Sequence, residues 1–234
     1  SYPDGYRSTV ELTLVSRSGS SVANASSPST ISVTQLQIPE KAEMEYRKGL
    51  ESLSRRRTSE AQRHFEAAIR IYPKFSESYQ QLGLLLAEQG HYPRAEETLQ
   101  KAIQIDGKNS NTYAYLGYVY QKANQVGKAE QAFRQSIGLN DANWLAQMGL
   151  GQILIGEKQP EKGLPHLLRA QKLHPGDPAI YLMVYNALIS LDRGPEALTE
   201  LDEFLARFPK DPMAPKLAKV RKGLAEAVRK ASHR

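Results

Sequence analysis

Apolar and small residues recur every 34 residues along most of this chain of 234 residues. The best-defined unit is 76–109, which contains a Leu82-Gly83 pair, a small Ala95 and an apolar Leu99. The equivalent positions of the other units hold Leu116-Gly117 and Leu150-Gly151, then Ala61, Ala129 and Ala197, then Phe65, Phe133, Leu167 and Leu201. A fixed period of this length predicts a repeat architecture, in which each unit buries its apolar face only by stacking on its neighbours.

Units of this length and pattern resemble the tetratricopeptide repeat (TPR) family, whose signature combines a W-x2-L-G-x2-Y segment with a small residue, an aromatic residue and a closing proline. The resemblance implies an all-α fold, a right-handed α/α superhelical solenoid of antiparallel helix pairs. Five repeats would fill residues 39–211, with units at 42–75, 76–109, 110–143, 144–177 and 178–211. In this family the small residues lie where the two helices of a pair cross, because they let the backbones approach and larger side chains interdigitate.

Some units depart from that pattern. The first aromatic position holds Glu45 in the first unit and Gln147 in the fourth, and Tyr185 replaces the small residue in the fifth. We therefore do not expect the fifth helix pair to cross as the others do. The fourth unit contains several glycines and has Pro165 inside its second helix, so we predict that this repeat opens most readily.

The segments at the two ends differ from the repeats. In residues 1–38, Val10, Leu12 and Leu14 alternate with polar residues, and a serine-rich stretch follows. This pattern predicts a short β-like or flexible segment. Its strands either pack on the solenoid or are the remnant of a preceding β-domain, and we favour the second interpretation. Two short strands alone are marginally stable in water.

Residues 212–234 are predicted to form a basic C-terminal capping helix, roughly 215–232. The net charge of +6 is concentrated at this end, since residues 207–234 hold nine Lys or Arg against two Asp or Glu. Leu217, Val220, Leu224 and Val228 form an apolar stripe that would cover the last repeat. Contact with nucleic acid or anionic lipid is the weaker alternative, because no aromatic residues interleave for base stacking.

Several classes of function find no support in the sequence. The chain has no cysteine, no apolar run that approaches the ~18 residues of a membrane span, and no nucleotide-binding or hydrolase motif. The histidines are scattered over the repeats without metal-ligand spacing, at His64, His91, His166, His174 and His233. We expect no enzyme activity, no cofactor and no metal.

The TPR resemblance implies that the first helix of each repeat lines a concave groove that binds a peptide or protein segment. The corresponding residues, carried over by position, are Tyr46, Leu50, Gln80, Leu84, Asn111, Ala114, Tyr118, Gln121, Leu145, Met148, Gln152, Ile155, Leu182, Asn186 and Ile189. Chaperone-binding members use a Lys, Asn and Arg clamp, and Tyr46, Leu50, Gln80 and Leu84 do not provide one. The groove becomes apolar toward the last two repeats, which favours a binding site with apolar anchors.

The sequence supports three hypotheses of function. The first is a non-enzymatic scaffold that binds a protein or peptide in the groove. The second is self-association into a homo-oligomer, in which the alternating residues of segment 31–38 could enter the groove. The third is an interaction module of a larger cell-envelope or regulatory protein, whose other domain carries the activity.

Overall fold

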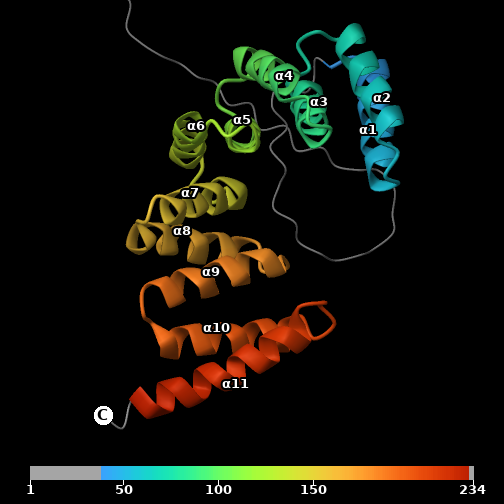
Figure 1. Cartoon of the computed structure of the whole chain (residues 1–234). Helices are drawn as coiled ribbons and strands as arrows, with labels where there is room; N and C mark the ends of the chain where they lie inside the picture. Colours follow the sequence, from blue (N-terminus) through green and yellow to red (C-terminus); the bar gives the residue numbers. More distant parts are fainter. Residues whose placement is uncertain (1–37, 232–234) are drawn as a thin grey trace, which may run out of the picture.

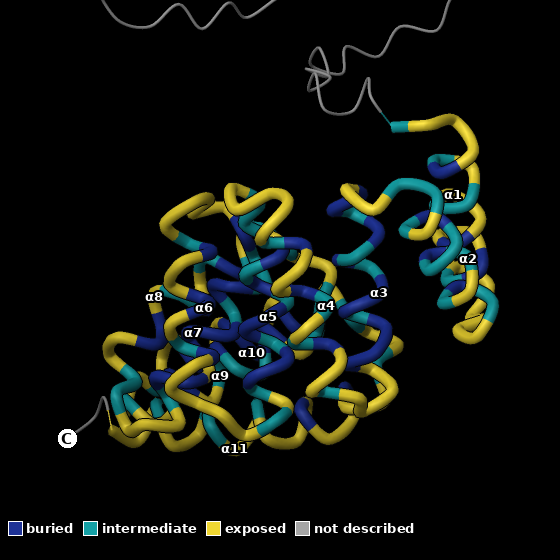
Figure 2. Tube along the Cα trace, turned by 90° about the horizontal axis from the view of Figure 1, so that it is seen from above, coloured by how far each residue is buried: buried dark blue, intermediate teal, exposed yellow. Residues whose placement is uncertain are grey.

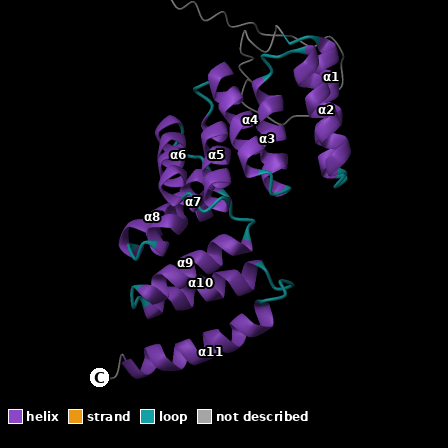
Figure 3. Cartoon of the chain, turned by 45° about the horizontal axis from the view of Figure 1, so that its top comes forward, coloured by secondary structure: helices purple, strands orange, loops and turns teal. Residues whose placement is uncertain are grey.

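The structure is a computed structural model that describes residues 38–231. These residues form eleven helices and no strand (Figures 1 and 3). The helices are α1 (Glu40–Ser54), α2 (Thr58–Ile71), α3 (Ser76–Glu88), α4 (Tyr92–Ile105), α5 (Ser110–Lys122), α6 (Val126–Leu139), α7 (Trp144–Gly156), α8 (Pro160–Leu173), α9 (Pro178–Ser190), α10 (Gly194–Arg207) and α11 (Ala214–Ala231). The strands predicted within 1–38 fall outside the described residues.

The helices stack as antiparallel pairs in chain order, from α1 and α2 at one end to α11 at the other (Figure 1). The helices α3, α5 and α7 also contact the preceding and following pairs, and α9 contacts the preceding pair. Buried residues lie along the contacts between helices, and exposed residues face outward (Figure 2). The predicted all-α solenoid of helix pairs is therefore confirmed.

Local sequence explains where the helices begin and turn. The side chains of Asn109, Asn143 and Asp177 accept hydrogen bonds from backbone N–H groups in the first turns of α5, α7 and α9, as N-caps do. The turn inside every pair contains one residue with positive φ: Arg56, Gly90, Asn124, Lys158 and Asp192. Glycine and asparagine tolerate this left-handed conformation, which commonly ends a helix.

Glycines on the odd-numbered helices of the first four pairs make room for a large side chain of the partner helix. A Cβ atom added to Gly49 would lie 2.5 Å from Phe65, and one added to Gly117 would lie 2.6 Å from Phe133. Gly83 and Gly151 make the same space for Leu99 and Leu167. The fifth pair has Tyr185 instead, and α9 and α10 pack less closely than the other pairs.

The last helix covers the end of the stack. Leu217 is buried against α9 and α10, and Leu224 is half-buried there. Arg221 donates to Asp202 of α10 at 2.7 Å. The helix begins at Ala214 and ends at Ala231, one residue before each predicted bound. None of the described helices is both long enough and apolar enough to span a membrane.

Candidate functional site

The odd-numbered helices from α3 to α9 lie side by side and form one face of the stack. Contacts join α3 to α5, α5 to α7 and α7 to α9. In each of these helices the buried positions share one arc, which packs on the even-numbered helices and the core. The remaining arc carries the more exposed side chains, so it is the part of these helices that a partner could reach.

The predicted groove residues differ widely in exposure. Leu50, Asn111, Gln152, Asn186 and Ile189 are exposed. Tyr46, Leu84, Tyr118, Gln121, Leu145, Met148, Ile155 and Leu182 are half-buried, and Gln80 and Ala114 are buried. The predicted groove residues therefore fall into two groups: those whose side chains are accessible, and those that pack between neighbouring repeats.

Gln80 and Ala114 belong to the second group. Gln80 Nε2 donates to Thr112 Oγ1 of the next repeat at 2.7 Å, and both side chains are buried. Met148 and Leu182 occupy the same repeat position, and each packs partly against an apolar cluster of the C-terminal helices. A substitution at any of these four positions would disturb contacts within the chain as well as any contact with a partner.

We call the row of exposed and half-buried residues over α5, α7 and α9 the inner wall: Tyr118, Gln121, Gln152, Ile155, Asn186 and Ile189. Gln121 Nε2 donates to Gln152 Oε1 at 3.1 Å, which joins α5 and α7 across this surface. Ile189 is 42% exposed. Ile155 is half-buried because its side chain reaches toward Gly163 of α8. The inner wall thus combines three amide side chains with one aromatic and two aliphatic ones.

Toward the N-terminal end, aromatic side chains of this face pack against one another. The ring of Tyr46 packs at 5.8 Å from Phe65 and 5.0 Å from Phe75, measured between ring centroids. Burial raises the pKa of Tyr46 to about 12 and also raises the pKa of Tyr115. These tyrosines stay neutral and act as packing residues, so less of this end is open to a partner.

Three histidines have partners inside the chain. His64 Nδ1 lies 2.7 Å from Glu45 Oε2, and His166 Nδ1 donates to Gln147 Oε1 at 2.7 Å. Burial lowers the pKa of His166, so this ring is neutral. The amide oxygen of Gln147 accepts the hydrogen bond that the ring N–H donates. His174 stacks on Trp144 with ring centroids 4.2 Å apart.

The two histidine pairs explain the departures at the first aromatic position. Glu45 and Gln147 are the residues that replace an aromatic ring there, and each has a histidine 19 residues later. The repeats that keep the aromatic residue have Thr98, Ala132 and Glu200 at that later position. Sequence reasoning missed this pairing, although comparing the two positions across repeats would have found it.

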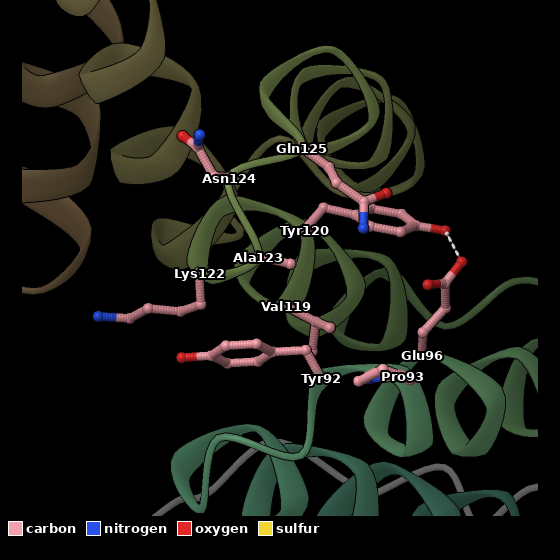
Figure 4. Close-up of a pocket in the computed structure, with 9 residues that line it drawn as sticks. All are labelled: Tyr92, Pro93, Glu96, Val119, Tyr120, Lys122, Ala123, Asn124 and Gln125. Carbon is pink, nitrogen blue, oxygen red and sulfur yellow. Dashed lines mark hydrogen bonds between the residues drawn. The ribbon is translucent and has the colours of Figure 1, made fainter.

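A small cleft lies between the start of α4 and the end of α5 (Figure 4). It has a volume of about 340 Å³, and Tyr92, Pro93 and Val119 contribute to its lining. Tyr120 donates to Glu96 Oε1 at 2.9 Å on one side of the cleft, as Figure 4 shows. The carboxylate therefore already has a partner, and sequence reasoning did not select this place.

Within residues 38–231, no group of three or more His, Asp or Glu residues is arranged to hold a metal ion. The side chains gathered on the inner wall are amides, aliphatic groups and one phenol. Such a surface can contact and hydrogen-bond a polypeptide, and it offers no nucleophile paired with a base.

Comparison with known proteins supports the fold. Two models of the tetratricopeptide repeat match residues 64–97 and 86–153. No curated protein matches the chain. The structure is similar to that of pilF from Pseudomonas aeruginosa, with a TM-score of 0.69 and 19% identity over 80% of this chain and 88% of that one.

Two further solved structures are similar at comparable identity. TTC0263, a thermophilic TPR protein of Thermus thermophilus, gives a TM-score of 0.62 and 18% identity, covering 79% of this chain and 98% of that one. YrrB, described as a TPR protein with an unusual peptide-binding site, gives 0.55 and 18%, covering 76% and 92%. Residues 64–153 therefore match tetratricopeptide repeats, and the helix pairs have the same fold as the TPR proteins among the structural neighbours.

Proposed function

We propose that this chain is a non-enzymatic scaffold that binds a segment of another polypeptide on the inner wall. The observation that carries the proposal is the row of accessible side chains over three successive helices, with the Gln121–Gln152 hydrogen bond crossing between them. A helical array of this kind leaves an extended surface open without distorting its own core. The peptide-binding site named for YrrB, a protein of similar fold, adds support.

The chemistry of the inner wall suits a polypeptide. An amide side chain offers a donor and an acceptor at once, which is also what a peptide backbone offers. Asn186 and Gln152 are exposed and can make such pairs, while Ile189 and Tyr118 supply apolar area. Burying apolar side chains of a partner there contributes roughly 25 cal/mol per Å² of area removed from water.

The same features argue against a reaction at this surface. His64 and His166 are engaged by Glu45 and Gln147, and they stand far apart in the stack. General acid–base catalysis needs a titratable group within hydrogen-bond reach of the substrate. The inner wall contains none that titrates near neutral pH.

The test compares two triple variants of the full chain. The inner-wall variant carries Gln152→Ala, Asn186→Ala and Ile189→Ala, and the control carries Gln131→Ala, Gln135→Ala and Leu139→Ala on the exposed side of α6. Both remove two amides and one exposed aliphatic side chain, so their effects on stability should be similar. Met148 and Leu182 are avoided because they also pack between helices.

Partners are captured from an extract with the wild-type chain, identified, and titrated against each purified variant by calorimetry. We expect the inner-wall variant to bind the partner at least about tenfold more weakly, which corresponds to ~1.4 kcal/mol. The control should bind as the wild type does. Equal affinity of all three proteins for every captured partner would remove the inner wall as the binding site.

A further inference from the structure

Two helices of the inner wall carry no charge. Neither α7 (Trp144–Gly156) nor α9 (Pro178–Ser190) contains Asp, Glu, Lys, Arg or His. Every other helix in the described part of the chain contains at least one of these residues. The third helix of the inner wall, α5, has a single such residue, Lys122, at its last position. Lys122 Nζ lies over the ring of Tyr118, 5.3 Å from the ring centroid, so only the α7 and α9 part of the inner wall is free of charge.

Burial alone does not explain this absence of charge. Ala179, Gln152, Asn186 and Ile189 are exposed, and exposed helix positions are where charged residues normally concentrate. The last helix does not cover α7, because α11 packs on α10 and the adjoining part of α9. The inner wall over α7 and α9 is therefore a solvent-facing surface without charge in a chain that is 24% charged.

This surface would discriminate strongly between partners. A charged side chain brought against it would lose hydration and find no opposite charge in return, which costs free energy. An apolar or neutral polar side chain would not meet this penalty. Complementarity here means that the occupant is itself uncharged.

The arrangement of the wall also limits the shape of the occupant. On each helix the amide or aromatic position precedes the second position by three residues, as in Gln152 and Ile155, or Asn186 and Ile189. The two positions therefore form parallel rows that cross the helices. Three helices packed at about 8–10 Å span roughly 20 Å, the length of about six extended residues.

We infer that the inner wall binds an extended segment of another protein, about six residues long, whose side chains are uncharged and mostly apolar where it crosses α7 and α9. This inference rests on the proposed function and names the class of partner. The backbone of the segment pairs with Gln152 and Asn186, and its apolar side chains pack beside Ile155 and Ile189. Affinity then depends little on ionic strength, since no ion pair forms.

The probe is a displayed library of randomised eight-residue peptides, selected against the full chain at about physiological salt. Peptides that compete with one another and lose binding in the Gln152→Ala, Asn186→Ala, Ile189→Ala variant report on the inner wall. We expect their central six positions to be depleted of Asp, Glu, Lys and Arg at least about fivefold. Their dissociation constants should change less than about twofold between about 50 and 500 mM salt.

A charge-switch variant makes the test sharper. Gln152→Lys with Asn186→Lys should select peptides with Asp or Glu at central positions and should lose the wild-type peptides at least about tenfold. The control, Gln131→Lys with Gln135→Lys on α6, adds the same charge and should select the wild-type class. Both pairs of positions are exposed, so all variants should fold.

The outcomes separate this inference from the proposed function. Inner-wall peptides that carry central charged residues would overturn the inference and leave the scaffold function standing. A library that yields no peptide sensitive to the inner-wall variant would overturn both. A concentration-dependent dimer that blocks the selected peptides would assign the wall to a second copy of the chain, and would also overturn the inference.

Discussion

Phe133 lies between two glycines that come from neighbouring repeats. A Cβ atom added to Gly117 of α5 or to Gly149 of α7 would overlap the phenyl ring. The ring is fully buried, so it joins three helices at one point. Gly149 is one of the several glycines that lower the helix propensity of the fourth unit, but it also provides space for this contact.

Gly149→Ala should therefore destabilise the protein, although alanine is the better helix former. Overpacking of a tight core costs about 1–3 kcal/mol, which exceeds the gain in helix propensity. Gly223→Ala in α11 is the matched control, since nothing lies within 4 Å of a Cβ atom there, and it should stabilise by about 0.5–1 kcal/mol. Urea unfolding measures both, and a Gly149→Ala protein as stable as the wild type would contradict this account.

Glu200 is a buried carboxyl between α8 and α10. Its side chain is 7% exposed, and Gln171 of α8 donates a hydrogen bond to it. Burial raises the pKa of Glu200 from 4.5 to about 7, because the charged form loses hydration. The folded protein then holds a proton that the unfolded chain has released between these two values.

Stability should consequently fall as the pH rises through this window. The contribution of protonated Glu200 is fully present below pH ~4.5 and is lost as the pH passes about 7. Glu200→Gln removes the charge and keeps the acceptor for Gln171, so it should stabilise by about 1–2 kcal/mol at pH ~8 and by little at pH ~5. The measurement is urea unfolding at both pH values, with Glu226→Gln on the exposed face of α11 as control.

At the scale of helices, the 34-residue period predicts most of the fold. The same buried residues return every 34 positions, and α3, α5, α7 and α9 begin at Ser76, Ser110, Trp144 and Pro178. The sequence could not reveal that Arg56 and Lys158 adopt positive φ, because neither residue favours that conformation, whereas Asn and Asp tolerate it. There the packing of the helix pair imposes the turn.

Prediction of the binding surface was limited by a different factor. The position of a residue within its repeat predicts whether it faces away from the partner helix. It does not predict how closely the next repeat packs against that residue. Gln80 and Ala114 are covered because the following helix packs over them, while Gln152 and Asn186 stay open. The exposure of a groove residue depends on how the adjacent helices pack, which the repeat pattern alone does not give.

The capping helix offers a test at this scale. Leu217 is 5% exposed and packs with Leu201 and Phe204, so Leu217→Ala should cost about 2–4 kcal/mol through the cavity that it leaves. Lys219→Ala on the exposed side should change stability by less than about 0.5 kcal/mol. Thermal unfolding of both variants decides whether α11 stabilises the stack. Similar small effects of both changes would mean that it does not.

Across the whole molecule, the apolar core is divided within the fourth repeat. One cluster of buried residues runs from α2 to α7, and separate clusters connect α8, α9, α10 and α11. The helices α7 and α8 meet through glycine, with a Cβ atom on Gly163 placed 2.8 Å from the carbonyl oxygen of Gly151. The α7 side chains that reach the next cluster, Met148 and Ile155, are only half-buried.

Two other features weaken the C-terminal part. Pro165 lies inside α8 and cannot donate the backbone hydrogen bond of its turn. The fifth pair packs less closely around Tyr185 than the pairs before it. Because a repeat array is stabilised mainly by nearest-neighbour contacts, α8–α11 should open as a unit while α1–α7 stay folded.

Native-state hydrogen exchange tests this division with two equivalent leucines. Leu99 and Leu167 are both fully buried and lie at the same repeat position, but they belong to different clusters. Leu167→Ala should lower the protection of α8–α11 by about 2–4 kcal/mol and leave α1–α6 nearly unchanged. Leu99→Ala should lower the protection of α1–α7 first. If either substitution lowers protection evenly over all eleven described helices, the stack unfolds as one cooperative unit, and the fourth repeat is not its weak point.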